Sequence, residues 1–363
     1  MQEQQGGWQG FRPAGQAGPT RPASSAGSVR TTRATRTARE PVPYVVYGRL
    51  ESWQAVALLG VLRAKGLASQ RVEPSASLVL ELAARTGRED GPYLRTPEGF
   101  VLAELPVMLD WLERVHPEPG LLPPPERPVR RICARILEAW IEDWLARRSA
   151  GRSPGGSAAR SGAELERLAA HLSSSRFLLG PAPSRADWLL AAWLETEVLV
   201  EPGVRADLRH RAPRLVSLAS ELFAVDGAAR PEADARDDAI ALSLLPLLEE
   251  IATDYHPYLQ ANRSALEEGE SEFVYTREPG RDQPALPERS ASLPRSLPGC
   301  SAARCRTRRE SELRRIEIGR ELATLPTAAQ AAVRRVLDPV GARRVYALPS
   351  VLEPIDPADP RSL

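Results

Sequence analysis

The segment of residues 43–113 constrains the fold most, because short strand and helix signals alternate within it. It begins with Tyr44–Tyr47, a run of β-branched and aromatic residues that Gly48 stops, as expected of a buried strand. Ser52 then precedes an apolar-periodic run closed by Lys65-Gly66. A serine before such a run and a glycine after it predict the N-cap and the end of a helix. The segment therefore opens with a strand, a tight loop and a helix.

The rest of this segment continues the mixed pattern. A short strand near residues 70–73 and a helix over 75–85 are expected first. Gly91–Leu102 then predicts two brief strands around a Pro-Glu-Gly turn, because proline presets φ and glycine adopts positive φ freely. A helix over Glu104–Val115 follows, with its apolar residues on one stripe. The resulting order predicts a thioredoxin-like βαβαββα domain over residues 42–116.

A proline cluster separates this domain from a long helical stretch. Residues 117–128 are rich in proline, which disfavours helix and predicts a linker. An all-helical domain is expected over 129–226, with a mobile Gly/Ser-rich loop at 149–162. Two sets of apolar residues at helical spacing predict core stripes rather than an aromatic cofactor site. They are Ile132, Ile136, Trp140 and Trp144 on one helix, and Leu165, Leu168 and Leu172 on another.

Residues 227–363 are predicted to form a helical extension. Helices are expected over 240–251 and 255–266, followed by a disordered loop near 267–298 that is rich in proline, serine and charge. A further helix is expected over 300–325, where arginines and glutamates alternate. Its glutamates favour a solvated or packing face over an RNA-binding face.

The first 41 residues are poor in apolar side chains and rich in Gly, Pro, Ser, Thr, Gln and Arg. Such a segment buries too little surface to offset the entropy of ordering the chain, so we predict a disordered tail. An organelle transit function is disfavoured because the arginine-rich part lacks an amphipathic apolar face.

Composition excludes several classes of protein. The formal net charge of +1 over 363 residues gives no general attraction to nucleic acid or to anionic membranes. No apolar run approaches the roughly 18 residues needed to span a bilayer. The three cysteines give no disulfide framework, so a reducing cytoplasm is the expected compartment. The scattered histidines and the Cys300/Cys305 spacing match no metal-binding motif, and we predict no metal.

Two motifs make the chain resemble the glutathione transferase family. The first is the strand that ends in Tyr47-Gly48 before a helix start, together with Pro92 ahead of the hairpin. The second is Phe177–Asp187, in which Ser184 and Asp187 predict a capping box before an apolar helix. The resemblance implies an α+β fold, a cis peptide bond before Pro92 and an all-helical second domain. The extension resembles the C-terminal tails of a bacterial subgroup of such proteins.

The resemblance also implies how glutathione would be activated. In this family a serine or tyrosine hydroxyl near the end of the first strand lowers the pKa of the glutathione thiol. Ser52 matches the serine position, where the helix N-terminus also favours a thiolate, and Tyr47 matches the tyrosine of other classes. We rank Ser52 above Tyr47 as the catalytic hydroxyl. Glu51, next to it, would oppose thiolate formation if its side chain pointed inward.

The resemblance places the rest of glutathione on three further residues. Gly91 and Pro92 would offer a backbone edge to the tripeptide, and Glu104 would hold the α-ammonium group of its γ-glutamyl end. Leu105 stands where the family has a serine, so only its backbone amide is left to meet the α-carboxylate. One lost charge-assisted hydrogen bond would weaken binding by about 1.5–3 kcal/mol.

Two functions follow as hypotheses. One is a cytoplasmic, homodimeric detoxification enzyme that conjugates glutathione, its co-substrate, to a hydrophobic electrophile, or reduces a peroxide with it. The other is a non-catalytic protein that keeps the fold as a scaffold for binding or assembly. Ser52, Pro92 and Glu104 favour the enzyme, whereas Leu105 and the extension favour the scaffold.

Overall fold

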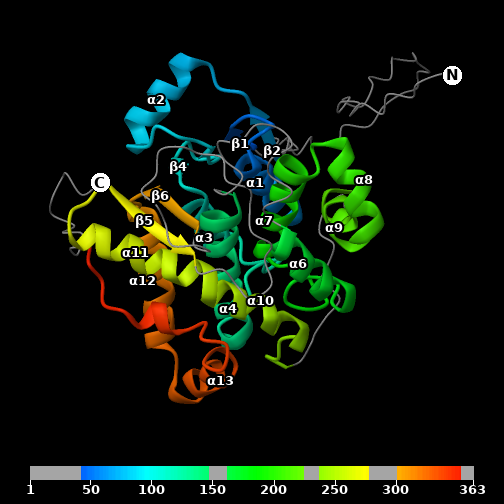
Figure 1. The fold of residues 1–363 in the computed structure, drawn as a ribbon. Coiled ribbons are helices and arrows are strands. Elements are labelled where there is room, and N and C mark those ends of the chain that lie inside the picture. The colour runs from blue at the N-terminus through cyan, green and yellow to red at the C-terminus, as the bar shows by residue number, and fades with distance from the viewer. Residues whose placement is uncertain (1–41, 147–161, 225–236, 278–300, 353–363) are drawn as a thin grey trace, which may run out of the picture. The chain divides into compact units, whose positions relative to one another are not determined.

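The computed structural model describes residues 42–146, 162–224, 237–277 and 301–352, and Figure 1 shows its ribbon. The first part is the predicted βαβαββα unit. Its strands form one sheet in the order β2-β1-β3-β4, in which β1 and β2 are parallel and the other pairs antiparallel. The strands are β1 (Tyr44–Tyr47), β2 (Ser69–Val72), β3 (Tyr93–Arg95) and β4 (Val101–Ala103). The helices are α1 (Trp53–Ala64), α2 (Ala76–Thr86) and α3 (Leu105–Val115).

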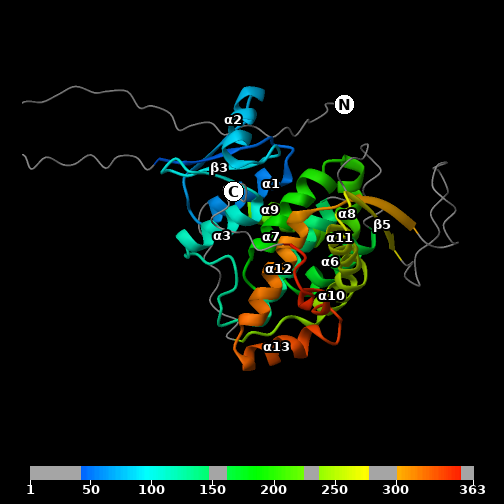
Figure 2. The ribbon, with the colours of Figure 1, turned by 90° about the vertical axis from the view of Figure 1, so that its left-hand side faces the viewer.

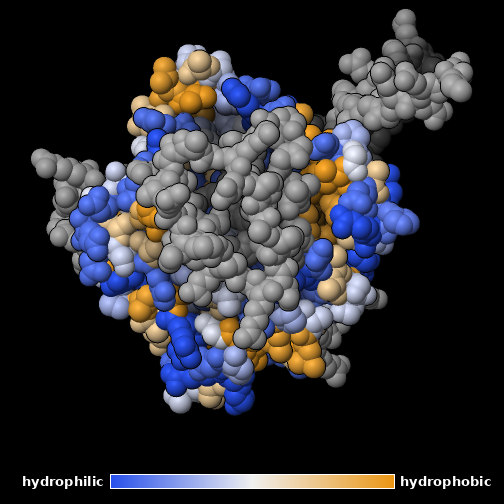
Figure 3. All heavy atoms as spheres, in the orientation of Figure 1, coloured by the Kyte–Doolittle hydropathy of each residue, from blue (hydrophilic) through white to orange (hydrophobic). Residues whose placement is uncertain are grey.

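The two faces of this sheet carry different helices. Figure 2 shows α2 on one side of the sheet and α1 and α3 on the other. Because side chains alternate along a strand, Tyr44 and Val46 join the large core that contains α1 and α3, whereas Val45 and Tyr47 pack under α2. The outer side of α2 carries Leu80, which is 72% exposed. Figure 3 shows a hydrophobic surface at the position of α2.

The second part is helical, as predicted. Its regular and π-helical segments are α4 (Pro128–Trp140), η1 (Ile141–Leu145), α6 (Gly162–Ser174), α7 (Arg185–Trp193), η3 (Leu194–Val198), α8 (Pro202–Arg211) and α9 (Pro213–Ala224). Both predicted apolar stripes are confirmed, because all of their residues are buried. The capping box of Ser184 and Asp187 is also present at the start of α7. These helices and the sheet share one hydrophobic core.

A glycine inside α1 lets the two parts approach closely. A Cβ atom on Gly60 would lie 2.6 Å from the Trp188 ring of α7 and 3.1 Å from the Phe223 ring. A glycine within a helix costs about 1 kcal/mol relative to alanine. Here its missing side chain makes room for two aromatic rings that stand edge to face, with centroids 5.7 Å apart. The tight contact of α1 with α7 therefore depends on this glycine.

The extension contains a hairpin that the sequence interpretation missed. Strand β5 (Glu272–Arg277) lies within the predicted loop, and β6 (Ser301–Arg306) lies within the predicted helix over 300–325. Alanine and arginine favour helix, but pairing with the aromatic and β-branched residues of β5 overrides that local preference. The helices of the extension are η4 (Leu242–Leu244), α10 (Leu245–Glu250), η5 (Ile251–Tyr255), α11 (His256–Glu267), α12 (Arg309–Thr324), α13 (Thr327–Leu337) and η6 (Arg344–Ala347).

Several predictions fall on residues that the structure does not describe. They concern the tail of residues 1–41, most of the loop at 149–162 and residues 278–298 of the loop after α11. Among the described helices, none is both long enough and apolar enough to cross a membrane.

Acid is expected to destabilise the fold through His256. The ring is buried against Tyr346, and among the described residues its Nε2 has no hydrogen-bond partner. Burial lowers the pKa of His256 to about 3. The unfolded chain binds this proton below a pH of about 6.5, so the free energy of unfolding should fall by about 1.4 kcal/mol per pH unit from there towards pH 3.

Urea unfolding between pH 4 and pH 7 measures this slope. The His256→Phe variant keeps an aromatic ring but cannot be protonated, so its slope should be shallower than that of the wild type. The matched control is His210→Gln, which alters an exposed histidine of α8. Equal slopes for wild type and His256→Phe would contradict the prediction.

Candidate functional site

Ser52 is the N-cap of α1, as the sequence indicates. Its Oγ accepts a hydrogen bond from the Ala55 amide at 3.3 Å, and its backbone is extended, as an N-cap requires. The oxygen is the acceptor in this bond, so the hydroxyl hydrogen remains available to donate to a ligand. The first-turn amides of α1 add a partial positive charge at the same place. The start of α1 is thus suited to a bound anion such as a thiolate.

Gly48 brings the start of α1 and the loop before β3 together. A Cβ atom on Gly48 would lie 2.7 Å from the Cβ of Ala55 and 3.4 Å from the Cβ of Pro92. The peptide bond between Gly91 and Pro92 is cis, as the family resemblance implies. The close approach needs a glycine at position 48, and it places Pro92 beside the first turn of α1. Two of the predicted site segments are therefore neighbours in the structure.

Glu104 has a backbone conformation that suggests a functional site. Its φ is +69°, and it is the one residue other than glycine with positive φ in the described ranges. Such a conformation costs about 1–3 kcal/mol in a side chain-bearing residue and occurs preferentially at binding and active sites. Glu104 stands at the N-cap of α3 without capping it through its side chain, so the carboxylate is available for other contacts. The next residue, Leu105, points its side chain into the core.

The carboxylate of Glu104 has a partner that sequence reasoning missed. Arg88, in the loop between α2 and β3, places its Nε 3.4 Å from Oε1 of Glu104. The same guanidinium donates from NH1 to Oε1 of Glu310, in the first turn of α12, at 2.8 Å. Burial alone would lower the pKa of Arg88, but the hydrogen bond to Glu310 and the nearby carboxylates raise it. Nothing in the sequence signals a contact between residues 222 positions apart.

Tyr47 lies on the other face of the sheet from the main core. Its ring packs with Val45, Leu82 and Tyr93 under α2, and the residue is 9% exposed. Glu51, by contrast, is exposed. The two candidate hydroxyl residues are therefore in different places: Ser52 is at the N-terminus of α1, and Tyr47 is in the small core under α2.

Comparisons with known proteins add a set of solved structures. No model of a protein family and no curated protein sequence matches the chain. A glutathione S-transferase from Rhodospirillum rubrum matches with 20% identity and a TM-score of 0.42, over 56% of this chain and 91% of that one. A rice enzyme, GST1, in complex with glutathione matches with 22% identity and a TM-score of 0.42, over 53% and 92%. One from Methylobacterium radiotolerans, in complex with glutathione sulfonate, has 25% identity and a TM-score of 0.36, over 53% and 98%.

The fold is glutathione transferase-like. The architecture described above carries this likeness. The strand order β2-β1-β3-β4, the cis bond before Pro92 and the helical part from α4 to α9 together have the arrangement that the sequence motifs imply.

The extension adds a helix across both parts of the transferase-like fold. At one end of α12, Glu310 pairs with Arg88 of the sheet domain. One turn later, Arg314 donates to Glu142 at 2.5 Å and to Asp143 at 2.8 Å, in η1 of the helical part. Helix α12 therefore links the two parts beside Glu104. Its charges were expected on a solvated or packing face, and the structure shows that several of them pack in ion pairs.

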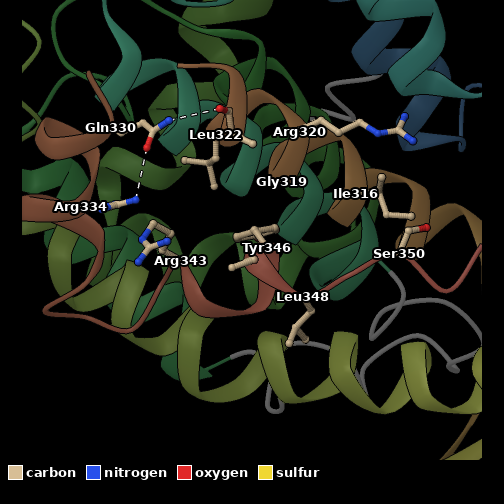
Figure 4. Close-up of a pocket in the computed structure, with 12 residues that line it drawn as sticks. Ile316, Gly319, Arg320, Leu322, Gln330, Arg334, Arg343, Tyr346, Leu348 and Ser350 are labelled. Atoms are coloured by element: carbon tan, nitrogen blue, oxygen red, sulfur yellow. Dashed lines mark hydrogen bonds between the residues drawn. The ribbon is translucent and has the colours of Figure 1, made fainter. Parts of the chain in front are cut away.

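A hollow in the extension lies among α12, α13 and η6 and has a volume of about 600 Å³. Figure 4 shows Arg334 and Arg343 near Gln330 at one end of it and Ile316 and Ser350 at the other. Arg334 donates to Gln330 at 3.4 Å, and Arg343 pairs with Asp338 at 2.6 Å. Both cations at this end thus already contact groups of the protein.

Three buried carboxylates also meet outside the transferase-like site. Oxygens of Glu164, Glu250 and Asp254 all lie within 4.8 Å of one another, although the sequence offered no metal motif. Arg167 forms an ion pair with Glu250 and gives the group a positive counter-charge. The cluster joins α6 to the helices of the extension.

Proposed function

We propose that this protein is a glutathione transferase-like enzyme that conjugates glutathione to a hydrophobic electrophile. The observation that carries the proposal is the close approach of Gly48 to both Ala55 and Pro92, which makes the first turn of α1, capped by Ser52, a neighbour of the cis-proline loop. The strained backbone of Glu104 supports a second subsite at the start of α3. In the proposed complex, Gly91 and Pro92 hold the backbone of the tripeptide and Glu104 holds its α-ammonium group.

Ser52 would act on the glutathione thiol. Its hydroxyl donates a hydrogen bond to the sulfur and stabilises the thiolate, and the amides at the start of α1 favour the same negative charge. The thiol proton passes to solvent. The thiolate then attacks the electrophilic carbon, a carbon–sulfur bond forms, and the leaving group departs with the electron pair of its bond. The same thiolate would serve in the reduction of a peroxide.

Replacing Ser52 by alanine tests this role. Loss of one preorganised donor to the reacting sulfur should lower kcat/KM for a chlorodinitrobenzene-type electrophile by about 100-fold. The matched control is Ser75→Ala, because the Oγ of Ser75 caps α2 by accepting a hydrogen bond of the same length, 3.3 Å, from the Leu78 amide. Each variant loses a helix cap worth about 1 kcal/mol, but only Ser52→Ala should lose activity.

Tyr47→Phe completes the comparison of the two hydroxyls. The variant should keep its activity if Ser52 is the thiolate partner. Full activity in Ser52→Ala together with loss of activity in Tyr47→Phe would reverse our ranking. Titration calorimetry with reduced glutathione comes first, because binding by the wild type is required by every form of the proposal.

A non-catalytic scaffold is the second candidate. Two observations favour it: Leu105 is buried and cannot offer a hydroxyl, and Arg88 and Glu310 already contact each other beside Glu104. This candidate predicts no heat with glutathione and no change in Tm at high glutathione concentration. The homodimer and the cytoplasmic location belong to the enzyme proposal, and sedimentation velocity on the full chain tests the dimer.

A further inference from the structure

Arg88 lies between a carboxylate of the proposed ligand site and a carboxylate of the extension. It contacts Glu104 at 3.4 Å and Glu310 at 2.8 Å. Its own carbonyl oxygen accepts a hydrogen bond from the Tyr93 hydroxyl at 2.8 Å, which fixes the loop at this point. Tyr93 directly follows Pro92. The backbone of Arg88 is therefore anchored to the same strand that carries the proposed tripeptide-binding edge.

The chemistry of the γ-glutamyl end requires more than Glu104. This end carries an ammonium group and a carboxylate on the same carbon atom. Glu104 suits the ammonium group, and the carboxylate next to it needs a donor. The side chain of Leu105 is apolar and 1% exposed, and Pro106 has no backbone N–H to donate. The start of α3 thus offers the carboxylate no side-chain donor, only the first-turn amides of Leu105 and Val107.

The guanidinium of Arg88 fits this unfilled role. It has five N–H donors, and the contacts with Glu104 and Glu310 use only part of them. A guanidinium binds a carboxylate through two parallel N–H bonds, which orients the ligand as well as attracting it. Because Glu104 has two oxygens, it can contact the ligand ammonium while it stays next to Arg88.

We propose that Arg88 binds the α-carboxylate of the γ-glutamyl group and that Glu310 of α12 positions it. This inference rests on the proposed function, because it assigns a further residue to the same glutathione site. It gives the extension a role in binding: a helix from the C-terminal part of the chain completes a subsite of the sheet domain.

The position of α12 supports this role for Glu310. Arg88 is about one third exposed, and a long side chain at the surface has many rotamers unless a partner holds it. Glu310 supplies that partner, and burial would raise its pKa, but the hydrogen bond from Arg88 lowers it. Arg314, on the next turn, is held by Glu142 and Asp143. Helix α12 is therefore held by ion pairs at two successive turns.

Calorimetry with two ligands tests the proposal. One is glutathione and the other is 4-aminobutyryl-cysteinylglycine, which lacks only the α-carboxylate. The wild type should bind glutathione at least about 10-fold more tightly than the analogue, which is the effect of one charge-assisted bond. In Arg88→Met this preference should disappear, with unchanged affinity for the analogue. Arg88→Lys, which keeps the charge but not the planar fork, should retain part of the preference.

Glu310→Gln tests the positioning role. It should lower the preference for glutathione several-fold, and the double variant with Arg88→Met should bind no worse than Arg88→Met alone, because both changes act through one contact. The controls are Arg85→Met on α2 and Glu317→Gln on α12, which are both exposed charges.

The outcomes separate this inference from the proposed function. Absence of glutathione binding by the wild type would overturn the proposed function and this assignment with it. Binding by the wild type with an undiminished preference in Arg88→Met would overturn the assignment of Arg88 alone. A Tm for each variant close to that of the wild type shows that the fold is kept. If Arg88→Met does not fold, Arg88→Lys provides the second test of the assignment.

Discussion

Replacing Lys65 by methionine is expected to lower the free energy of unfolding by about 3–5 kcal/mol, because it leaves a largely buried carboxylate without its cation. The Nζ atom of Lys65 donates to the carbonyl oxygens of His116 at 2.7 Å and Pro119 at 2.9 Å. It also forms an ion pair with Glu113 at 2.9 Å, and its side chain is fully buried. One ammonium group thus connects the end of α1, the last turn of α3 and the following linker.

Glu113 extends this arrangement into the linker. Its Oε1 accepts hydrogen bonds from the amides of Leu121 at 2.8 Å and Leu122 at 3.1 Å. The carbonyl of Leu121 in turn accepts from the amide of Arg185, the first residue of α7, at 2.8 Å. Lys65 therefore supports the path by which the chain passes from the sheet domain to the helical part. Its loss should loosen the linker as well as lower global stability.

Urea unfolding of three variants measures the effect. Lys65→Arg should also destabilise the protein, because a larger planar group must fit where the ammonium is fully enclosed. The double variant Lys65→Met with Glu113→Gln should recover part of the loss, since it removes the unpaired charge. A Lys65→Met protein as stable as the wild type would show that the ammonium group makes no net contribution to the free energy of unfolding.

Replacing Arg315 by methionine should also lower the free energy of unfolding by about 3–5 kcal/mol, through a loss of contacts in the extension. Arg315 is 1% exposed and pairs with the fully buried carboxylate of Glu312 through two hydrogen bonds, at 2.7 and 2.6 Å. Its remaining donors reach three backbone carbonyls near the end of the described chain. They belong to Val345 at 3.0 Å, Leu348 at 2.8 Å and Pro349 at 3.1 Å.

The loss of local stability should be greatest in residues 345–350, where backbone carbonyls accept hydrogen bonds from Arg315. Amide hydrogen exchange of residues 345–350 should become faster in Arg315→Met, together with a lower midpoint of urea unfolding. Arg315→Lys should not restore either value, because an ammonium cannot meet Glu312 in a bidentate manner and three carbonyls as well. The control, Arg344→Met, removes an exposed arginine of η6 and should change neither. Unchanged exchange in Arg315→Met would contradict the prediction.

The candidate site was predictable where its signals are local. A serine ahead of an apolar-periodic run indicated the N-cap at Ser52, and a proline ahead of a hairpin indicated the loop of Pro92. The structure has both features and brings their neighbours into contact at Gly48. The roles of Ser52, Tyr47, Gly91, Pro92 and Glu104 remain predictions for the experiments above.

The missing parts of the site come from distant residues. In the sequence, nothing distinguishes Arg88 from the other arginines of polar loops, or Glu310 from the other charged residues of the helix that contains it. Their contact depends on where α12 packs, and α12 packs where Arg314 and the apolar residues of its buried face find partners. A pattern within a short window carries no information about such a contact.

The amino-acid sequence alone determined the order of strands and helices up to α3, the helical character of the part that follows, the apolar stripes of the core and the caps of α1 and α7. These features depend on periodicity and turn chemistry within about fifteen residues. Only the tertiary structure decided that residues 301–306 form a strand, that Lys65 holds the linker and that Arg88 joins Glu104 to Glu310. In each of these cases the stabilising energy comes from hydrogen bonds and ion pairs between segments far apart in the chain. Such contacts can override the local helix or strand propensity of the residues.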